Sequence, residues 1–194
     1  MTSASDKSAQ VIEGRECGEC SLCCKVMRVE EIAKHPGTWC KDCALGKGRC
    51  KIYVTRPAAC RDFLCSWLLQ AELGPEWFPA SAKLTLQAEP TRLSVWVDPA
   101  FPSRWCEEPY YSQIRTWARL AVGEQQVLIF TGKKVTAVLP NKEVDLGEAE
   151  ADDHIMVGEL NVPPGHLPDW DAYIVKAADV PPEDRDKWVI KGPH

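Results

Sequence analysis

The sequence lacks the features that mark membrane, exported and nucleic-acid-binding proteins. Its opening residues contain no apolar stretch of the kind that a secretory signal needs, and no apolar run approaches the roughly 18 residues that cross a bilayer. Basic residues are not in excess, because the formal net charge is -5 and the isoelectric point is about 5.4. We therefore expect a cytoplasmic protein without a membrane partner, and we do not expect nucleic acid as a partner.

Familiar catalytic motifs are also missing. The chain has no Gly-rich phosphate-binding loop, and no arrangement of Ser, His and Asp stands out as a catalytic triad. The sequence therefore names no reaction, no substrate and no protein partner, and it leaves open whether the protein is an enzyme.

Cysteine is almost absent from most of the chain and concentrated in one part. Nine of the ten cysteines lie between Cys17 and Cys65, and the remaining one is Cys106. This distribution excludes a disulfide scaffold spread over the whole chain. In a reducing cytosol, clustered cysteines more often bind metals or carry out redox chemistry than form structural disulfides. A disulfide-bonded module exported by another route is the alternative, and the missing signal argues against it.

Composition divides the chain into five segments. Apolar residues make up 45% of the sequence, which is enough for a hydrophobic core. We predict a lead-in over residues 1–16, a cysteine-rich module over 17–70, a linker over 71–81, an α+β domain over 82–160 and a Pro-rich tail over 161–194.

The α+β domain is predicted from the spacing of its apolar residues. Alternation of apolar and polar residues indicates strands, and a period near 3.6 indicates a helix. A strand–strand–helix–strand–strand order predicts an antiparallel domain, on which the metal-stabilised module packs. The expected strands are 84–88, 93–97, 126–130, 135–139 and 154–160, and the expected helix is 109–122.

The cysteine spacing indicates metal ligands. A C-x2-C turn lets two sulfurs converge on one ion, and the first run contains two such turns that share a cysteine. A C-x2-C-x2-C run is also the spacing with which bacterial ferredoxins hold three corners of an iron–sulfur cluster. We therefore expect zinc or an iron–sulfur cluster, and the candidate ligands are Cys17, Cys20, Cys23, Cys24, Cys40, Cys43, Cys50, Cys60 and Cys65.

Nine thiols exceed by one the eight that two four-sulfur sites need. Two sites with one spare thiol fit this count. A polynuclear zinc centre with bridging sulfurs and a single site with redox-active thiols fit it too. The side chains of Cys23 and Cys24 diverge because the two residues are adjacent, so one of them serves a second centre, bridges two ions or remains a thiol.

Two local features bear on the ligands. Residues 17–65 contain nine Lys or Arg and five Asp or Glu, and such a basic setting favours thiolates. The run Thr55-Arg56-Pro57 predicts a helix start, after which Cys60 and Cys65 would lie roughly 140° apart around one straight helix. Either the helix ends between these two cysteines or they have different roles.

Two motifs resemble those of the YkgJ-like cysteine-cluster (CxxCxxCC) family, which is described as zinc- or iron-chelating. They are CGECSLCC at 17–24 and GRCKIYVTRPAACRDFLC at 48–65, and they cover about the first third of the chain. The family has no general assigned reaction, and it carries a less regular cysteine where Cys40 and Cys43 stand. The resemblance implies metal binding through Cys17, Cys20, Cys23, Cys24, Cys50, Cys60 and Cys65.

Other polar residues are weaker candidates. His35 follows a short helical pattern and is either a tenth ligand or a surface histidine at a helix end. Asp152, Asp153 and His154 fit a hard-metal or acid–base site, or a solvated acidic loop, and the loop is favoured. Cys106 stands beside two glutamates and is expected to have a packing role.

Three functions follow from this sequence. The first is a cytoplasmic protein that holds zinc or an iron–sulfur cluster through clustered thiolates, with zinc favoured if the metal is structural. The second is an iron–sulfur redox protein or oxidoreductase component, which the C-x2-C-x2-C run motivates. The third is a metal-delivery or metal-sensing protein, because the surplus thiol permits ligand exchange.

Overall fold

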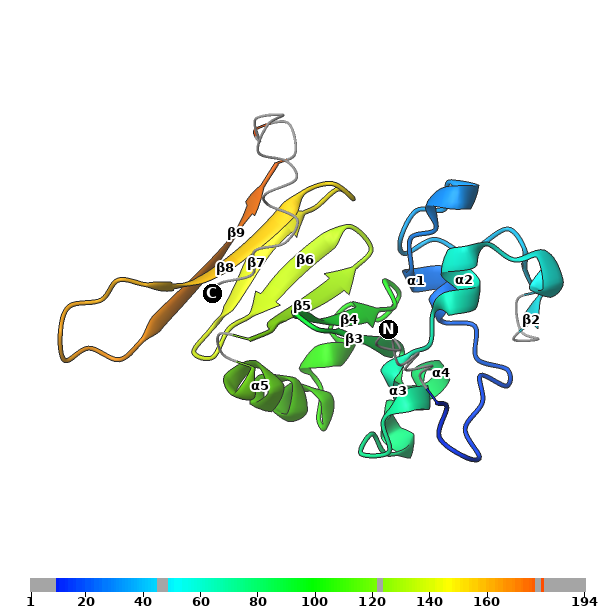
Figure 1. The fold of residues 1–194 in the computed structure, drawn as a ribbon, viewed down its shortest axis with the longest axis horizontal. Helices are drawn as coiled ribbons and strands as arrows, with labels where there is room; N and C mark the ends of the chain where they lie inside the picture. The colour runs from blue at the N-terminus through cyan, green and yellow to red at the C-terminus, as the bar shows by residue number, and fades with distance from the viewer. Residues whose placement is uncertain (1–9, 45–48, 122–123, 177–178, 180–194) are drawn as a thin grey trace, which may run out of the picture.

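The computed structural model describes residues 10–44, 49–121 and 124–176, together with residue 179. It combines a cysteine-rich N-terminal region, a five-stranded mixed sheet with a helix on one face, and a two-stranded hairpin. Figure 1 shows the cysteine-rich region at one end of the sheet and the hairpin at the other. The predicted α+β class is confirmed. Residues 1–9 of the predicted lead-in and residues 177–178 and 180–194 of the predicted Pro-rich tail lie outside the described residues.

The cysteine-rich region consists of short elements joined by turns. None of its described helices and strands is longer than five residues. The two large apolar clusters in the described part of the chain have no buried member before Leu73, so this region contributes little to either. The elements are α1 (Cys23–Val26), η1 (Glu30–Ile32), β1 (Cys43–Ala44), β2 (Arg49–Cys50), η2 (Tyr53–Thr55), α2 (Ala58–Asp62) and α3 (Ser66–Leu69).

The helix predicted after Pro57 forms but is short. α2 ends at Asp62, the backbone becomes extended at Phe63, and α3 begins immediately after Cys65. The helix therefore ends between Cys60 and Cys65, which is one of the two expected outcomes. The break frees Cys65 from the orientation that a continuous helix would impose.

The sheet has the strand order β3-β4-β5-β6-β7. β3 and β4 form an antiparallel pair with Leu84 opposite Val97, and the predicted hairpin of β5 and β6 turns through Gly132, whose φ is 63°. The bounds are β3 (Leu84–Glu89), β4 (Arg92–Val97), β5 (Gln126–Thr131), β6 (Lys134–Val138) and β7 (Glu143–Glu148).

The prediction of a purely antiparallel sheet is wrong at one pair. β4 and β5 are parallel, with Val95 opposite Ile129. The helix α5 (Tyr110–Leu120) connects the two strands and returns the chain to the end of the sheet where β4 begins. β5 therefore starts at the same end as β4 and runs in the same direction.

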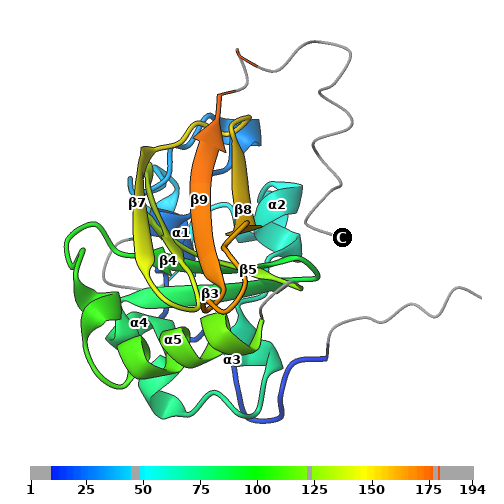
Figure 2. The same cartoon turned by 90° about the vertical axis from the view of Figure 1, so that its left-hand side faces the viewer.

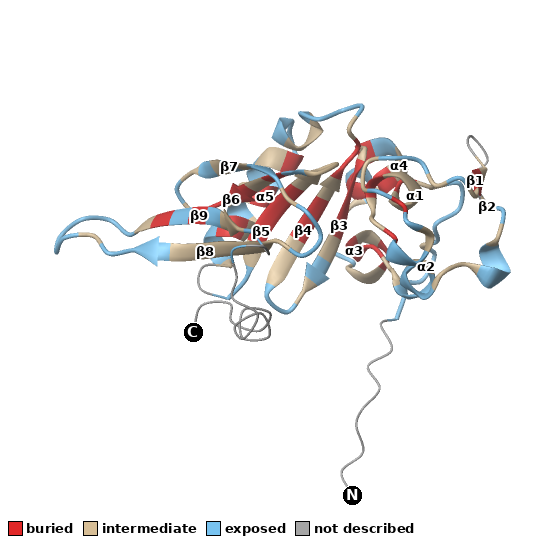
Figure 3. Ribbon diagram, turned by 90° about the horizontal axis from the view of Figure 1, so that it is seen from above, coloured by how far each residue is buried: buried red, intermediate tan, exposed pale blue. Residues whose placement is uncertain are grey.

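α5 and the segment before the sheet cover one sheet face. Ile114 and Ala118 on α5 are buried against the apolar residues of the strands, which confirms the helical period seen in the sequence. Trp77 is 5% exposed, and its ring lies 5.0 Å from that of Tyr110 and 5.1 Å from that of Trp117. Figure 3 shows the buried residues concentrated on the central strands. The predicted linker thus contributes to the core. It forms η3 (Pro75–Trp77) and the start of α4 (Pro79–Ala82), which leads into β3. A further short element, η4 (Arg104–Cys106), follows β4.

We expect Ile114→Ala to lower the free energy of unfolding of the sheet by about 2–5 kcal/mol, because this fully buried side chain would leave a cavity. Leu120 on the same helix is 77% exposed, and Leu120→Ala should change the free energy by no more than about 0.5 kcal/mol. Urea unfolding followed by far-UV circular dichroism measures both. Equal effects of the two substitutions would contradict the packing of α5.

The hairpin of β8 (His154–Leu160) and β9 (Asp169–Val175) packs on the sheet face opposite α5 at the β7 end of the sheet, and Figure 2 shows it beside β7. Trp170 and Ala172 of β9 pack against the sheet. Their partners are Leu128 of β5, Ala137 of β6 and Leu139, which follows β6. β8 was predicted, whereas β7 and β9 were not. β7 lies in an acidic stretch whose outward side chains obscure the pattern, and β9 lies in the segment predicted as a tail.

The cysteine-rich region is joined to the sheet by polar and close backbone contacts. The Lys25 Nζ lies 2.5 Å from Oδ1 of Asp98, which follows β4, and both side chains are largely buried. Gly37 has a φ of 79°, and a Cβ there would lie 2.9 Å from Cγ of Pro99 and 3.0 Å from Cα of Gly132. This close approach needs glycine, so the loop before Cys40 is held against the β5–β6 turn.

No helix in the described part of the chain is long and apolar enough to cross a membrane.

Candidate metal centre

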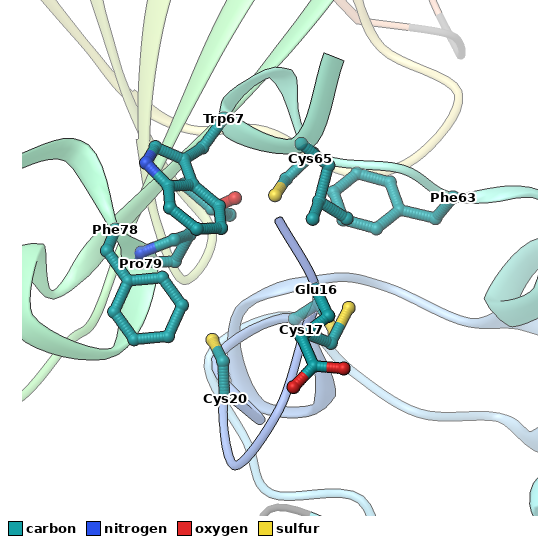
Figure 4. A pocket seen from close by; sticks show the side chains of 11 residues that line it. Glu16, Cys17, Cys20, Phe63, Cys65, Trp67, Phe78 and Pro79 are labelled. Atoms are coloured by element: carbon teal, nitrogen blue, oxygen red, sulfur yellow. The ribbon is translucent and has the colours of Figure 1, made fainter. Parts of the chain in front are cut away.

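Four cysteines from distant parts of the sequence line one cavity of about 30 Å³. Cys17 and Cys20 come from the first C-x2-C turn, in which the Cys20 N–H donates to the Cys17 carbonyl at 2.8 Å. Cys23 begins α1, and Cys65 precedes α3. Figure 4 shows Cys17, Cys20 and Cys65 around the same opening. The structure therefore brings the late cysteine next to the early run.

Aromatic and apolar side chains form the walls of this cavity. Phe63, Trp67 and Leu68 come from the cysteine-rich region, and Phe78 and Pro79 come from the segment that leads into the sheet. The rings of Trp67 and Phe78 lie 4.9 Å apart. The cavity thus lies at the joint between the two parts of the protein, where Cys65 is buried, Cys20 and Cys23 are partly buried and Cys17 is exposed.

Arg15 holds the rim of this joint in place. Its guanidinium donates to the carbonyls of Trp67, Gln70 and Leu73, and it lies 4.8 Å from the centre of the Trp67 ring. The segment entering the first C-x2-C turn is thereby tied to α3.

A buried hydroxyl also lines the cavity. The Thr85 residue on β3 is 2% exposed, and its Oγ1 has no hydrogen-bond partner in the described structure. An unpaired buried hydroxyl costs about 1–3 kcal/mol, so its position beside thiols calls for an acceptor. A metal-bound thiolate sulfur is such an acceptor, and the residues present therefore fit a sulfur-ligated centre.

The other cysteines gather in a second group. The Cys40 N–H donates to the Cys24 carbonyl at 2.9 Å, and the Cys43 N–H donates to the Cys40 carbonyl at 3.1 Å. The short β1–β2 ladder places Cys43 opposite Cys50. Cys60 on α2 lies close enough to Cys24, Cys40 and Cys50 for their charges to affect it.

Five of the thiols, two in the first group and three in the second, have a raised pKa. Burial raises the pKa of Cys17 and of Cys20, with further effects from neighbouring thiols. A hydrogen bond with Cys23 and then burial raise the pKa of Cys24, and burial raises the pKa of Cys43 and of Cys60. Neighbouring thiols resist joint ionisation, so a bound cation would have to displace their protons.

One buried or half-buried cation lies beside each group. Lys34 is 7% exposed and donates from Nζ to the carbonyls of Lys25 and Met27, near the end of α1. Burial lowers its pKa, and the nearby thiols of Cys40, Cys24, Cys23 and Cys60 act in the opposite direction. Arg56 lies near enough to Cys17 to favour its thiolate. These cations supply the basic setting that the composition indicated.

The grouped thiols are neighbours rather than a closed coordination shell. Across the described residues, no three or more His, Cys, Asp or Glu side chains are arranged so that they could hold a metal ion as they stand. All ten cysteines are free, so no disulfide connects them. The structure thus supplies the grouping of the candidate ligands, and metal binding remains a prediction.

The weaker candidates have structural surroundings. His35 is exposed, Cys106 is exposed and outside both groups, and His154 begins β8. Asp153 accepts from Lys176 at 2.7 Å and from the Glu150 N–H at 2.9 Å, which ties the β7–β8 connection to the end of β9. Asp152 is exposed.

Arg56 and Arg61, the two arginines that follow Cys50 in the second motif, differ in their surroundings. The guanidinium of Arg56 stacks 4.1 Å from the centre of the Tyr53 ring, and its Nε is buried without a hydrogen-bond partner in the described structure. Arg61 is exposed on α2. Arg56 therefore belongs to the candidate site, whereas Arg61 does not.

The sequence did not single out Lys34, Thr85 or Phe78 as part of the site. Thr85 lies between the apolar residues Leu84 and Leu86, and successive side chains of a strand point to opposite faces. The sequence therefore predicts that Thr85 lies on the sheet face opposite the α5 core. What covers that face depends on the packing of the cysteine-rich region, which the local pattern does not encode.

No family model matches the chain, and neither the curated proteins nor the solved structures provide a match.

Proposed function

We propose that this protein binds metal through clustered cysteine thiolates, as zinc or as an iron–sulfur cluster. The observation that carries the proposal is the convergence of Cys17, Cys20, Cys23 and Cys65 on one cavity with aromatic walls. The third and fourth of these residues are far apart in sequence, so local spacing alone does not account for their meeting.

The chemistry of the donors supports both metals. Four thiolates suit tetrahedral zinc, and they also suit the corners of an iron–sulfur cluster. Zinc would supply folding free energy, whereas an iron–sulfur cluster would add electron transfer. The unpaired Thr85 hydroxyl and the neighbouring Arg56 guanidinium would offset the negative charge of a sulfur-rich centre of either kind.

The resemblance of residues 17–24 and 48–65 to zinc- or iron-chelating proteins agrees with this proposal. Zinc is favoured for a structural role, because the cysteine-rich region has only short elements and contributes little to the apolar clusters. The second candidate is an iron–sulfur redox protein, which the C-x2-C-x2-C run and the aromatic walls of the cavity favour.

Metal analysis of anaerobically purified protein tests the proposal. We expect stoichiometric zinc in a colourless protein, or iron with acid-labile sulfide in a brown one, and either result supports metal binding. The second result would replace zinc by the redox candidate. Protein that retains neither metal after anaerobic loading with each would overturn the proposal. Cys106→Ser is the matched control and should keep the full metal content, because Cys106 lies outside both groups.

A further inference from the structure

We infer that the clustered cysteines form two separate metal centres, divided between Cys23 and Cys24, an inference that rests on the proposed function. The first centre uses the four cysteines of the cavity. The second draws its ligands from the five cysteines of the window 17–65 that do not line the cavity. They are Cys17, Cys20, Cys23 and Cys65 for the first centre, and Cys24, Cys40, Cys43, Cys50 and Cys60 for the second.

The division follows from the local geometry of α1. Successive residues of a helix point about 100° apart, so neighbouring thiols face different directions. Cys23 lines the cavity, whereas Cys24 is not among its lining residues. The Cys24 carbonyl accepts from the Cys40 N–H, which ties the second C-x2-C turn to α1 at Cys24.

Backbone pairing assembles the second group independently of the cavity. The β1–β2 ladder places Cys43 opposite Cys50, and the Lys51 N–H donates to the Asp42 carbonyl at 2.8 Å. The Ala59 N–H donates to Oε1 of Glu31 at 3.2 Å, which holds the start of α2, and with it Cys60, against η1. None of the residues from 24 to 62 lines the cavity.

The surroundings of the two groups differ as well. The first group touches the sheet region through Phe78, Pro79 and Thr85. The second group lies near the buried Lys34, whose ammonium caps the carbonyls at the end of α1. Metal in the first centre would tie the cysteine-rich region to the sheet, and metal in the second would hold the loops around β1 and α2.

The thiol count agrees with this division. Four thiolates complete a tetrahedral zinc site, so the first group is complete and the second has one thiol more than it needs. The backbone already brings the cysteines of each group together. To bind an ion, their side chains must rotate so that the sulfurs point toward it. The thiols of Cys23 and Cys24 also hydrogen-bond to each other, so a bridging sulfur is the specific alternative that a test must separate.

Cadmium titration of the reduced, metal-free full-length chain tests the inference. We expect two cadmium ions per chain and two ¹¹³Cd resonances in the range of four-sulfur sites, without cadmium–cadmium coupling through a shared sulfur. The doubly substituted Cys17→Ser/Cys65→Ser chain should bind one ion and keep one resonance. Cys40→Ser/Cys43→Ser should bind one ion and keep the other resonance. Cys106→Ser, as the control, should bind two.

The outcomes separate this inference from the proposed function. A chain that binds no cadmium, zinc or iron would overturn both. A chain that binds one ion, or that shows coupled cadmium resonances, would retain metal binding and overturn the two separate centres. These two measurements use the unsubstituted chain, so they decide the question even if a substituted chain fails to fold.

Discussion

Removal of the metal with a chelator is expected to unfold residues 17–70 while the five-stranded sheet stays folded. The described helices and strands of this region contain at most five residues, and isolated helices of that length are unstable in water. Structural zinc contributes about 10–16 kcal/mol to the folding of small thiolate modules. The sheet, in contrast, buries its own apolar cluster against α5.

Amide hydrogen exchange before and after chelation measures this effect. The N–H groups of Cys20, Cys40 and Cys43 donate to backbone carbonyls in the cysteine-rich region and should lose their protection. Amides of Val95 and Ile129, in the central parallel pair, serve as the internal control and should keep theirs. Unchanged protection of all five amides would contradict a metal-dependent fold.

Cys20→Ser should reproduce part of this loss without a chelator, because a serine hydroxyl replaces one thiolate of the first group. We expect a lower metal content and faster exchange of the amide at position 20 and of the Leu68 amide, which donates to the Cys65 carbonyl, than in the Cys106→Ser control. Full metal content in Cys20→Ser would refute its assignment as a ligand.

Lys25→Met is expected to destabilise the protein by about 3–5 kcal/mol, because it leaves Asp98 as an unpaired buried charge. The Asp98 side chain is 8% exposed, lies 2.5 Å from Lys25 Nζ through Oδ1, and accepts the Ala100 N–H at 2.8 Å. The Asp98 N–H also donates to the Lys83 carbonyl, which keeps the carboxylate in place after the substitution.

Chemical denaturation of the metal-loaded protein measures this change. Lys41→Met is the matched control, because Lys41 lies in the same region and is exposed, and it should cost less than about 1 kcal/mol. Adding Asp98→Asn to Lys25→Met should recover part of the loss, since the buried charge is then removed as well. Equal costs for Lys25→Met and Lys41→Met would show that solvent screens the Lys25–Asp98 pair.

Local patterns carried enough information for the predicted strands and helix of the sheet region. Alternation over 84–88 and 93–97 and the helical period of Ile114 and Ala118 arise from burial on one face, and the structure confirms these elements. β7 and β9 were missed for the converse reason. Their apolar residues pack against partners distant in sequence, while acidic or Pro-rich neighbours dominate the local composition.

The type of donor in the candidate site was readable from spacing, because a C-x2-C turn places two thiols close together without help from the rest of the fold. The sequence by itself thus determined an α+β chain with a separate thiol-rich region. Only the tertiary structure decided that β5 runs parallel to β4, that Cys65 joins Cys17, and that Thr85 lies beside them. These arrangements depend on the α5 crossover, on the helix break before Cys65 and on the docking of the cysteine-rich region against the sheet, and each of these brings together residues that no local period connects.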